Sequence, residues 1–478
     1  MKSIGFRLIT LLAVPVFLCG LSSGAEIAVT EDPFDEIERA LKTDSFEEAL
    51  ILSESLAAFS PLDAEAQALY GLALLRSGRY REAELALLAA LGLDEKCAEA
   101  HLGMGRLAAG MNRRDRAVLH FREAIKSGRF RGEAFWCFGA LLADSGDFSA
   151  ALQVAEAAPG QLDYLGDNAL TAIRRRLEFY RFLAGEPCFQ IPASFQKTTV
   201  DLMPRAGTSG DEFETSFMMS INGEESGPFR ISTAFTEYLV VSSSLADRLG
   251  LQRFGSLSIP HPGADAITGE GTLIESLEIG GLKMSRVPAA VVADSDLAGG
   301  AQGIVGIGFL KRFNFSLDIS EGTLQLTRGD RPDLILLKIN PERAAARVPL
   351  YLGPLPATLV SVNGLEDSLF VIDLESETTI IDSSWFDAQI APGLPRGTVA
   401  EATAVGPGGV MQEGRLFSAN KFKMSGLELS DQPLVVLDLS RVEKGVRQRV
   451  AGIIGRDILN RFRLHFSLSQ PEMILEIP

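Results

Sequence analysis

Residues 362–386 read VNGLEDSLFVIDLESETTIIDSSWF, and this stretch decides the fold of the C-terminal two thirds of the chain. A related stretch, INGEESGPFRISTAFTEYLVVSSSL, begins earlier in the chain, at Ile221. Each copy holds an Asn-Gly pair between apolar runs, which is a strong β-hairpin signal because both residues tolerate a positive φ. The sequence therefore predicts two hairpins, and the second strand of each ends at a short polar motif.

The two copies continue to match beyond the hairpin. Residues 279–282 correspond to residues 424–427, and each segment is followed by a proline and an apolar strand. The segment Gly303–Phe313 corresponds to Gly452–Phe462, and a short strand follows in each case. Short β-rich runs separated by turns predict two β units, at residues 212–330 and 345–478.

These features together resemble the retropepsin-like aspartic protease family in its bacterial form, present as two tandem copies. The resemblance implies two small closed all-β barrels, each with a hairpin leading into an Asp-Thr-Gly motif, a mobile flap, and an apolar-apolar-Gly segment beside the catalytic loop. Ile304-Val305-Gly306 and Ile453-Ile454-Gly455 match that last segment. Flap tips are expected at His261–Gly271 and Ala404–Gly414, although the second could equally be a disordered glycine-rich loop. The two units could pair about a pseudo-two-fold axis, as in pepsin-like enzymes, with one cleft per chain.

The residues at the positions of the Asp-Thr-Gly motif in each copy decide whether aspartic proteolysis is chemically feasible. Aspartic proteolysis needs two carboxylates that share one proton, because two like charges about 3 Å apart cannot both ionise. In the family, the threonine hydroxyl cross-links the two loops and the glycine leaves room for substrate. The first copy reads Ser232-Thr233-Ala234, so the threonine is kept, the carboxylate is missing and Ala234 adds a methyl group. The second copy reads Asp373-Leu374-Glu375, so the aspartate is present, but Leu374 lacks the hydroxyl and Glu375 replaces glycine with a bulky anion.

These degenerate motifs leave two functions open. The first is a binding or scaffolding protein that has lost catalysis but kept the fold, with Asp373 as a residual polar residue that bonds loop amides or Ser232. The second is an aspartic-type endopeptidase with an unusual dyad and Asp373 as its catalytic residue. That dyad requires either two chains paired through Asp373, or Glu375 as the second carboxylate. Glu375 should point elsewhere, because it lies in the same loop as Asp373. If the units pair within one chain, Ser232 and Asp373 should face each other within one hydrogen bond or one bridging water.

Other chemistries have less support. Ser232 is a poor candidate for a nucleophile, because the sequence shows no nearby His or Lys that could act as its general base. The glycines of residues 303–308 lie outside any GxGxxG or P-loop context and match the protease-like segment better. The arginine-rich stretch Arg441–Arg449 is expected to be a solvated turn or helix rather than an anion site. The four histidines are scattered and there is no CxxC pair, so we expect neither a metal site nor a cofactor.

The N-terminal third carries a second kind of repeat. Gly71, Gly105 and Gly139 recur at one constant interval, and Ala83, Ala117 and Ala151 recur at the same interval. Small residues at fixed helical positions let two paired helices approach closely, while large apolar residues fill the gaps between pairs. The pattern resembles the tetratricopeptide repeat, whose unit is about 34 residues long, so residues 30–185 are expected to form an all-α solenoid.

The resemblance to the tetratricopeptide repeat implies a concave surface for a protein or peptide partner. The alternative is a spacer that helps the chain to oligomerise. Residues 186–211 follow the repeat and contain several prolines and glycines. They are predicted to be a linker with at most one edge strand.

The N-terminus predicts export. Lys2 and Arg7 accompany an apolar run, Leu8–Leu18, which is too short to span a bilayer. Small residues follow at Ser23-Gly24-Ala25, so residues 1–25 are expected to be a signal peptide cut after Ala25, and the protein to be periplasmic or secreted. Lipidation at Cys19 is the rival interpretation, which the large Leu18 disfavours. No later segment is long and apolar enough to predict a transmembrane helix.

The net charge limits the classes of partner, and the cysteine count limits the possible disulfides. The net charge of −17 disfavours nucleic acid and anionic membrane surfaces. Cys97, Cys137 and Cys188 remain after the signal, which leaves open one disulfide or three free thiols. The sequence therefore favours a protein or peptide as the partner.

Overall fold

The computed structural model describes residues 32–478 except 186, 206–212, 261–264, 298–299, 330–338, 340–341, 396, 406–410 and 469. The predicted signal peptide, residues 1–25, lies outside the described residues. Within the described part of the chain, no helix has the length and apolar character needed to cross a membrane.

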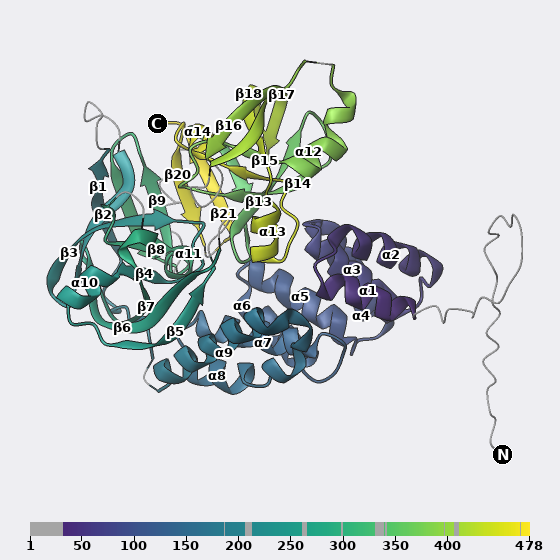
Figure 1. The fold of residues 1–478 in the computed structure, drawn as a ribbon, viewed down its shortest axis with the longest axis horizontal. Helices are drawn as coiled ribbons and strands as arrows, with labels where there is room; N and C mark the ends of the chain where they lie inside the picture. The colour runs from purple at the N-terminus through teal and green to yellow at the C-terminus, as the bar shows by residue number, and fades with distance from the viewer. Residues whose placement is uncertain are drawn as a thin grey trace, which may run out of the picture.

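The described chain as far as Leu183 forms a helical array of antiparallel pairs, coloured purple to blue in Figure 1. Its helices are α1 (Pro33–Lys42), α2 (Phe46–Phe59), α3 (Ala64–Arg76), α4 (Tyr80–Leu93), α5 (Ala98–Gly110), α6 (Arg114–Ala124), α7 (Arg131–Ala143), α8 (Phe148–Ala155) and α9 (Gly166–Leu183), with short 3₁₀ turns at Pro159–Gln161 and Asp163–Leu165. The helices α1, α3, α5 and α7 pack successively against one another. They form one continuous face, which we call the inner face.

The regularly spaced glycines lie where the two helices of a pair touch. A Cβ atom on Gly71 would be 2.6 Å from the side chain of Leu87, and one on Gly105 would be 2.7 Å from the ring of Phe121. Real Cβ atoms do not approach other heavy atoms this closely, so glycine is required at these positions for the pairs to close. The spacing read from the sequence is therefore a packing requirement.

The first β unit is a closed barrel of six strands. Its strands and helices are β2 (Phe213–Ile221), β3 (Glu224–Ser232), β4 (Leu239–Ser242), α10 (Ser243–Arg248), β5 (Arg253–Ile259), β6 (Ile267–Ile279), β7 (Leu282–Val292), a 3₁₀ turn at Asp294–Asp296, β8 (Gly303–Gly306) and α11 (Ile307–Leu310). The strand order is β2-β3-β8-β4-β7-β6, and β6 pairs back with β2 to close the barrel. The expected hairpin is confirmed as β2–β3, with positive φ at Asn222 and Gly223.

The second β unit repeats this connectivity. Its elements are β12 (Tyr351–Leu352), β13 (Pro356–Val362), β14 (Ser368–Ile372), β15 (Ile380–Asp382), α12 (Ser383–Gln389), a 3₁₀ turn at Ala391–Gly393, β16 (Ala400–Val405), β17 (Met411–Met424), β18 (Leu427–Leu437), α13 (Ser440–Val446), β19 (Gly452–Ile454) and α14 (Arg456–Leu459). The order β13-β14-β19-β15-β18-β17 closes through the pairing of β17 with β13. The hairpin expected at Asn363-Gly364 is confirmed as β13–β14.

A shared antiparallel sheet joins the two units. Its strands, in order, are β1 (Lys197–Pro204), β10 (Thr323–Arg328), β9 (Phe313–Asp318), β20 (Arg463–Ser467), β21 (Glu472–Glu476) and β11 (Ala344–Pro349). At its centre Ser316 pairs with His465, and the offset between these two residues equals the offset between the matching segments that begin at Gly303 and Gly452. A pseudo-two-fold axis therefore passes between Ser316 and His465, and the two units pair within one chain.

Strand β1 corrects one expectation about residues 186–211. The sequence predicts a linker with at most one edge strand, but β1 pairs with β10 on one side and β2 on the other. Thr198 and Leu202 on one face of β1 are buried, whereas Lys197 and Thr199 are exposed. This alternation is typical of a half-buried strand and explains why the segment belongs to the sheet.

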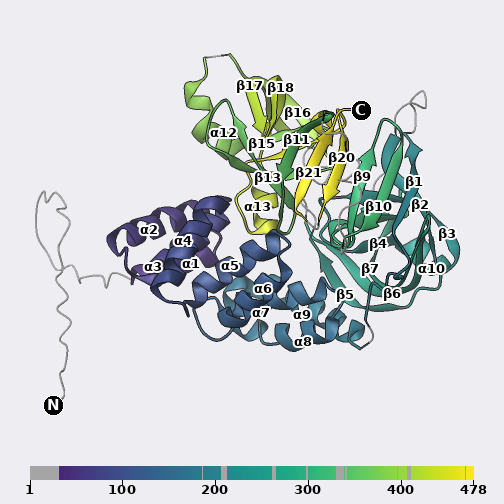
Figure 2. The ribbon, with the colours of Figure 1, turned by 180° about the vertical axis from the view of Figure 1, so that it is seen from behind.

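The array lies along one side of both β units, as Figure 2 shows from behind. Contact with the first unit is made by α9 against β5. Contact with the second unit is made partly by α13 and the turn that follows it, which lie next to α5 in both views. The expectation that Arg441–Arg449 would be a solvated turn or helix is therefore wrong for Arg447 and Gln448, whose side chains bond residues of the array.

Candidate functional site

The two motif loops leave their barrels at equivalent places. Strand β3 ends at Ser232 and runs parallel to β8, while β14 ends just before Asp373 and runs parallel to β19. Gly306 is the last residue of β8 and Gly455 directly follows β19, and both lie against backbone carbonyl groups of the motif loops, with no room for a Cβ atom. The two apolar-apolar-Gly segments thus let each motif loop fold back onto its own barrel.

Thr233 connects the two units. Its hydroxyl donates to the carbonyl oxygen of Ile372 at 2.8 Å and accepts from the backbone N–H of Leu374 at 3.1 Å, and the side chain is fully buried. A buried hydroxyl that both donates and accepts is fully satisfied. Leu374, which takes the equivalent place in the second unit, is buried and apolar, so the cross-link is made in one direction only.

Ser232 occupies the first position of its motif and is buried. Its oxygen accepts from the backbone N–H groups of Ala234 at 3.2 Å and Phe235 at 3.3 Å. Its hydroxyl donates across the interface to the Oε2 atom of Glu375. Ser232 therefore links the two units through its side chain.

Asp373 bonds within its own loop. Its Oδ1 atom accepts from the backbone N–H of Glu375 at 2.8 Å, and its Oδ2 atom accepts from the hydroxyl of Ser376 at 2.8 Å. Asp373 and Ser232 thus accept equivalent bonds from the residue two positions later, which fits the pseudo-two-fold relation. The direct partner of Ser232 across the axis, however, is Glu375 and not the Asp373 that the sequence led us to expect.

The orientation of Glu375 corrects a second expectation. The sequence suggests that it points away from the opposite motif, but its side chain reaches Ser232 and also pairs with Arg230, whose Nε atom is 2.6 Å from Oε1. A carboxylate that leaves water needs donors to compensate, and the first unit supplies both. Burial raises the pKa of Glu375 above its usual value, the positive charge of Arg230 opposes this rise, and the negative charge of Asp373 adds to it.

Arg230 and Ser376 were not singled out by the sequence analysis, although the sequence holds a signal for each. Arg230 precedes Ser232 by two positions on β3, and alternate residues of a strand point to the same face. Ser376 follows Asp373 by three positions in the same loop, so its hydroxyl is near enough to donate to the carboxylate. Both residues hold a carboxylate of the site in place.

Two hairpins belong to the regions where flaps were expected. They are β5–β6 and β16–β17, which pair up to Ile259 with Ile267 and up to Val405 with Met411. Most of the loop that joins each pair, at 261–264 and 406–410, lies outside the described residues. The expected flap tips are therefore only partly covered by the structure.

The described residues were also searched for groups that could bind a metal ion and for reactive cysteines. Among the residues described here, no group of three or more His, Cys, Asp or Glu side chains could hold a metal ion. Cys97, Cys137 and Cys188 are free thiols. Burial raises the pKa of Cys97 and of Cys137 to about 11, so neither has the lowered thiol pKa of a reactive cysteine.

Comparison with known proteins adds a remote likeness. No protein-family model matches the sequence, and no curated protein matches it. Among solved structures, the chain is similar to conglutin gamma, a basic 7S globulin from lupine seeds, with a TM-score of 0.36 and 12% identity over 59% of this chain and 95% of that chain. The connectivity of the chain itself defines its class: a helical array is followed by two β-barrels of the same connectivity, which share a sheet.

Proposed function

We propose that this protein is an exported scaffold that binds a protein or peptide, built from a tetratricopeptide array and two retropepsin-like units that no longer cleave. The paired barrels, the shared sheet and the motif loops on either side of the pseudo-two-fold axis support the retropepsin-like assignment. The regular glycine spacing and its packing role support the tetratricopeptide assignment. Export is proposed from the signal-like N-terminus alone.

The observation that carries the proposal is the network of Glu375, Arg230 and Ser232. Catalysis requires two carboxylates that share a proton and hold a water between them. Here Oε1 of Glu375 faces a guanidinium group and Oε2 accepts from Ser232. Both oxygens of Asp373 accept from donors of its own loop. The two carboxylates thus have separate partners, and among the described residues no hydrogen bond joins them, so these contacts give no support for a shared proton.

The proposal places the peptide between two hairpins, one from each unit. Each contributes a long hairpin, β5–β6 or β16–β17, and the two hairpins lie in equivalent places about the axis. An extended peptide can bind between such hairpins through its backbone, and this mode of recognition does not need catalytic residues. The cleft is therefore proposed to hold a peptide without cutting it.

An aspartic-type endopeptidase is the second candidate, and one observation favours it. Glu375 brings a second carboxylate beside the position where the first motif lacks one, and its pKa is raised by burial. A raised pKa is what the acid of a catalytic pair requires. Against this, Arg230 stabilises the charged form of Glu375, which opposes its use as an acid.

Peptide cleavage tests the two candidates. The purified chain would be incubated with a mixed peptide library between about pH 4 and about pH 7, where an aspartic pair would titrate, and the products identified by mass spectrometry. Asp373→Asn and Glu375→Gln would be run beside it. We expect the same uncut library in all three samples, with intact peptides retained by the immobilised protein. Cleavage by the wild-type chain that disappears in Asp373→Asn would overturn the proposal in favour of the endopeptidase.

A further inference from the structure

The turn that follows α13 inserts its side chains into the helical array. The helix ends at Arg447, which has a left-handed backbone with φ 52° and ψ 45°. This conformation is unusual for a residue other than glycine, so the contacts around it must hold it there. The residues Arg447, Gln448 and Arg449 form what we call the basic turn.

The basic turn bonds the array through both backbone and side chains. The Nε atom of Arg447 donates to the carboxylate of Asp44 at 3.0 Å. The backbone carbonyl oxygen of Arg447 accepts from the side chain of Arg76 at 2.8 Å. The backbone N–H of Arg449 donates to the carbonyl oxygen of Arg76 at 2.8 Å. Gln448 donates to the carbonyl oxygen of Leu75 at 2.9 Å, at the C-terminal end of α3. The turn thus satisfies carbonyl groups that a helix end leaves without an intrahelical partner.

The array side of this contact is an organised polar site. Arg76 of α3 and Glu133 of α7 are buried and paired at 2.8 Å, and Arg106 of α5 also contacts Glu133. Burial opposes the ionisation of Glu133, but the positive charges of Arg76, Arg106 and Arg447 outweigh it and hold the pKa of Glu133 below its usual value. A buried charge network of this kind fixes side chains in one arrangement, so the site is preorganised for a ligand that brings donors and a carbonyl group.

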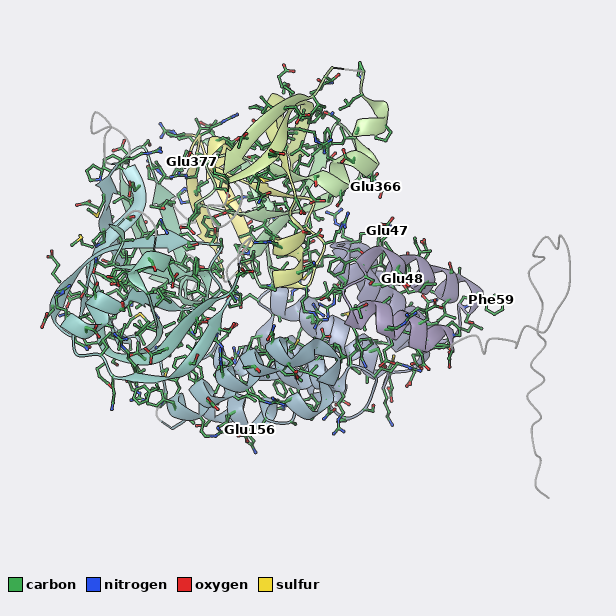
Figure 3. The ribbon with its side chains drawn as sticks, viewed as in Figure 1. Glu47, Glu48, Phe59, Glu156, Glu366 and Glu377 are labelled. Atoms are coloured by element: carbon green, nitrogen blue, oxygen red, sulfur yellow. The ribbon has the colours of Figure 1, made fainter. Side chains whose placement is uncertain are left out.

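The contact leaves open space on both sides of the basic turn. A groove of about 610 Å³ runs between the start of α2 and α13, lined on the array side by Asp44, Glu47 and Glu48 and on the other side by Lys444 and Arg449. Glu47 and Glu48 lie on the side of the array towards the second unit (Figure 3). A cavity of about 70 Å³ lies beside Gln448, next to Tyr80 and Arg106. The turn is therefore held largely by directed polar contacts, and the stacked rings of Tyr80 and Tyr351 pack beside it.

We propose that the inner face of the array is a binding site for an arginine-containing peptide turn, and that the basic turn of the same chain is its built-in competitor. This inference rests on the proposed function, in which the array binds a partner, and it names the chemistry of that partner. The acidic groove favours a basic segment, Asp44 receives a guanidinium group, and the end of α3 receives backbone and amide donors. A partner gains access by displacing the basic turn.

Competition within one chain sets the expected behaviour. A tethered segment acts at an effective concentration on the order of millimolar, so a free peptide of equal intrinsic affinity binds the wild-type chain weakly. Weakening the basic turn removes the competitor and exposes the site. The affinity for a free peptide should then rise, although the substitutions lie outside the site that the peptide occupies.

A fluorescence anisotropy titration tests this prediction. The probe is a labelled peptide with the sequence of residues 442–451, VEKGVRQRVA, added to the full chain. The variant Arg447→Ala with Gln448→Ala should bind it at least about tenfold more tightly than the wild-type chain does. Lys423→Ala, an exposed lysine on β17 outside the groove, should behave like the wild-type chain. A peptide with alanine in place of the arginine and glutamine that correspond to Arg447 and Gln448 should not compete. Equal affinities of the double variant and the wild-type chain would overturn the proposal.

Hydrogen exchange on the wild-type chain gives an answer even if the double variant does not fold. The backbone N–H of Arg449 is bonded to Arg76, and it should exchange faster when about 1 mM unlabelled peptide displaces the turn. Unchanged exchange under these conditions would also overturn the proposal. Peptide cleavage with Asp373→Asn is a separate measurement on the β units. A failed competition therefore does not bear on the pseudoprotease assignment, and a cleaving protein does not bear on the basic turn.

Discussion

The hydroxyl group of Ser232 donates a hydrogen bond to the carboxylate of Glu375, and the two residues come from opposite β units, 143 positions apart. Ser232 holds the first position of the first motif, and Glu375 holds the third position of the second motif. These two motif residues are therefore in contact across the pseudo-two-fold axis. Together with Arg230 they form one partly buried network that links the two units.

Removal of the Ser232 hydroxyl should destabilise the pair of units. In Ser232→Ala the partly buried Oε2 atom of Glu375 loses this donor, and the loss of one hydrogen bond costs about 0.5–1.5 kcal/mol. Urea unfolding followed by circular dichroism measures the loss. Ser55→Ala, an exposed serine on α2, is the matched control and should change stability by less than about 0.5 kcal/mol. Equal stabilities of the two variants would show that the bond contributes nothing.

Thr233 should contribute more than Ser232, because it holds two backbone groups of the other unit. Thr233→Val keeps the shape of the side chain but leaves the carbonyl of Ile372 and the N–H of Leu374 without this partner, and we expect a loss of about 2–4 kcal/mol. The same unfolding experiment measures it. Thr398→Val, at an exposed threonine, should have little effect. A loss no larger than that of the control would contradict the cross-linking role.

Glu375 should give stability a recognisable dependence on pH. Its pKa in the folded chain is raised, chiefly by burial, so the folded chain holds this proton to a higher pH than the unfolded chain does. The contribution of Glu375 to the free energy of unfolding is therefore complete below the ordinary glutamate pKa, and it is lost as the pH rises through the raised pKa of the folded chain. The stability of the wild-type chain relative to Glu375→Gln should fall as the pH increases from about 4 to about 7, measured as urea midpoints. Parallel pH profiles in the two proteins would argue against a raised pKa.

Two glycines of α5 should respond in opposite directions to the same substitution. In Gly105→Ala the new methyl group would lie 2.7 Å from the ring of Phe121, and such overpacking costs about 1–3 kcal/mol. In Gly110→Ala the new group meets no atom within 4 Å, and a helical Gly→Ala change stabilises by about 0.4–1 kcal/mol. Thermal unfolding of both variants tests the packing role of the regular glycine spacing. A Gly105→Ala protein as stable as the wild-type chain would show that the pair can close around a methyl group.

Much of the architecture could be predicted from local sequence signals. The Asn-Gly pairs set the positions of both hairpins because few residues accept a positive φ, and the matching segments that follow them set the correspondence of the two units. The regular spacing of glycines located the helix pairs, because these glycines lie where two helices touch. These signals act over a few neighbouring residues, or repeat at a fixed interval, and are therefore visible in one chain.

Three features were not predictable in this way. Strand β1 was expected in a linker, because the prolines and glycines on either side conceal that both of its edges find partners. The basic turn was expected in solvent, but its side chains bond the array. Composition does not reveal this, because arginine side chains can donate equally well to water or to the carbonyl groups at a helix end. Glu375 was expected to point away from the opposite loop, because its sequence neighbours do not include Arg230 and Ser232.

The sequence by itself determined the repeats, the hairpins and the residues at the two motif positions, because each of these follows from residue type and spacing. Only the tertiary structure decided which motif side chains meet across the two units and what occupies the inner face of the array. Both answers depend on side chains brought together from distant parts of the chain. The direction of a buried carboxylate or guanidinium group is set by the donors and acceptors that the fold places around it.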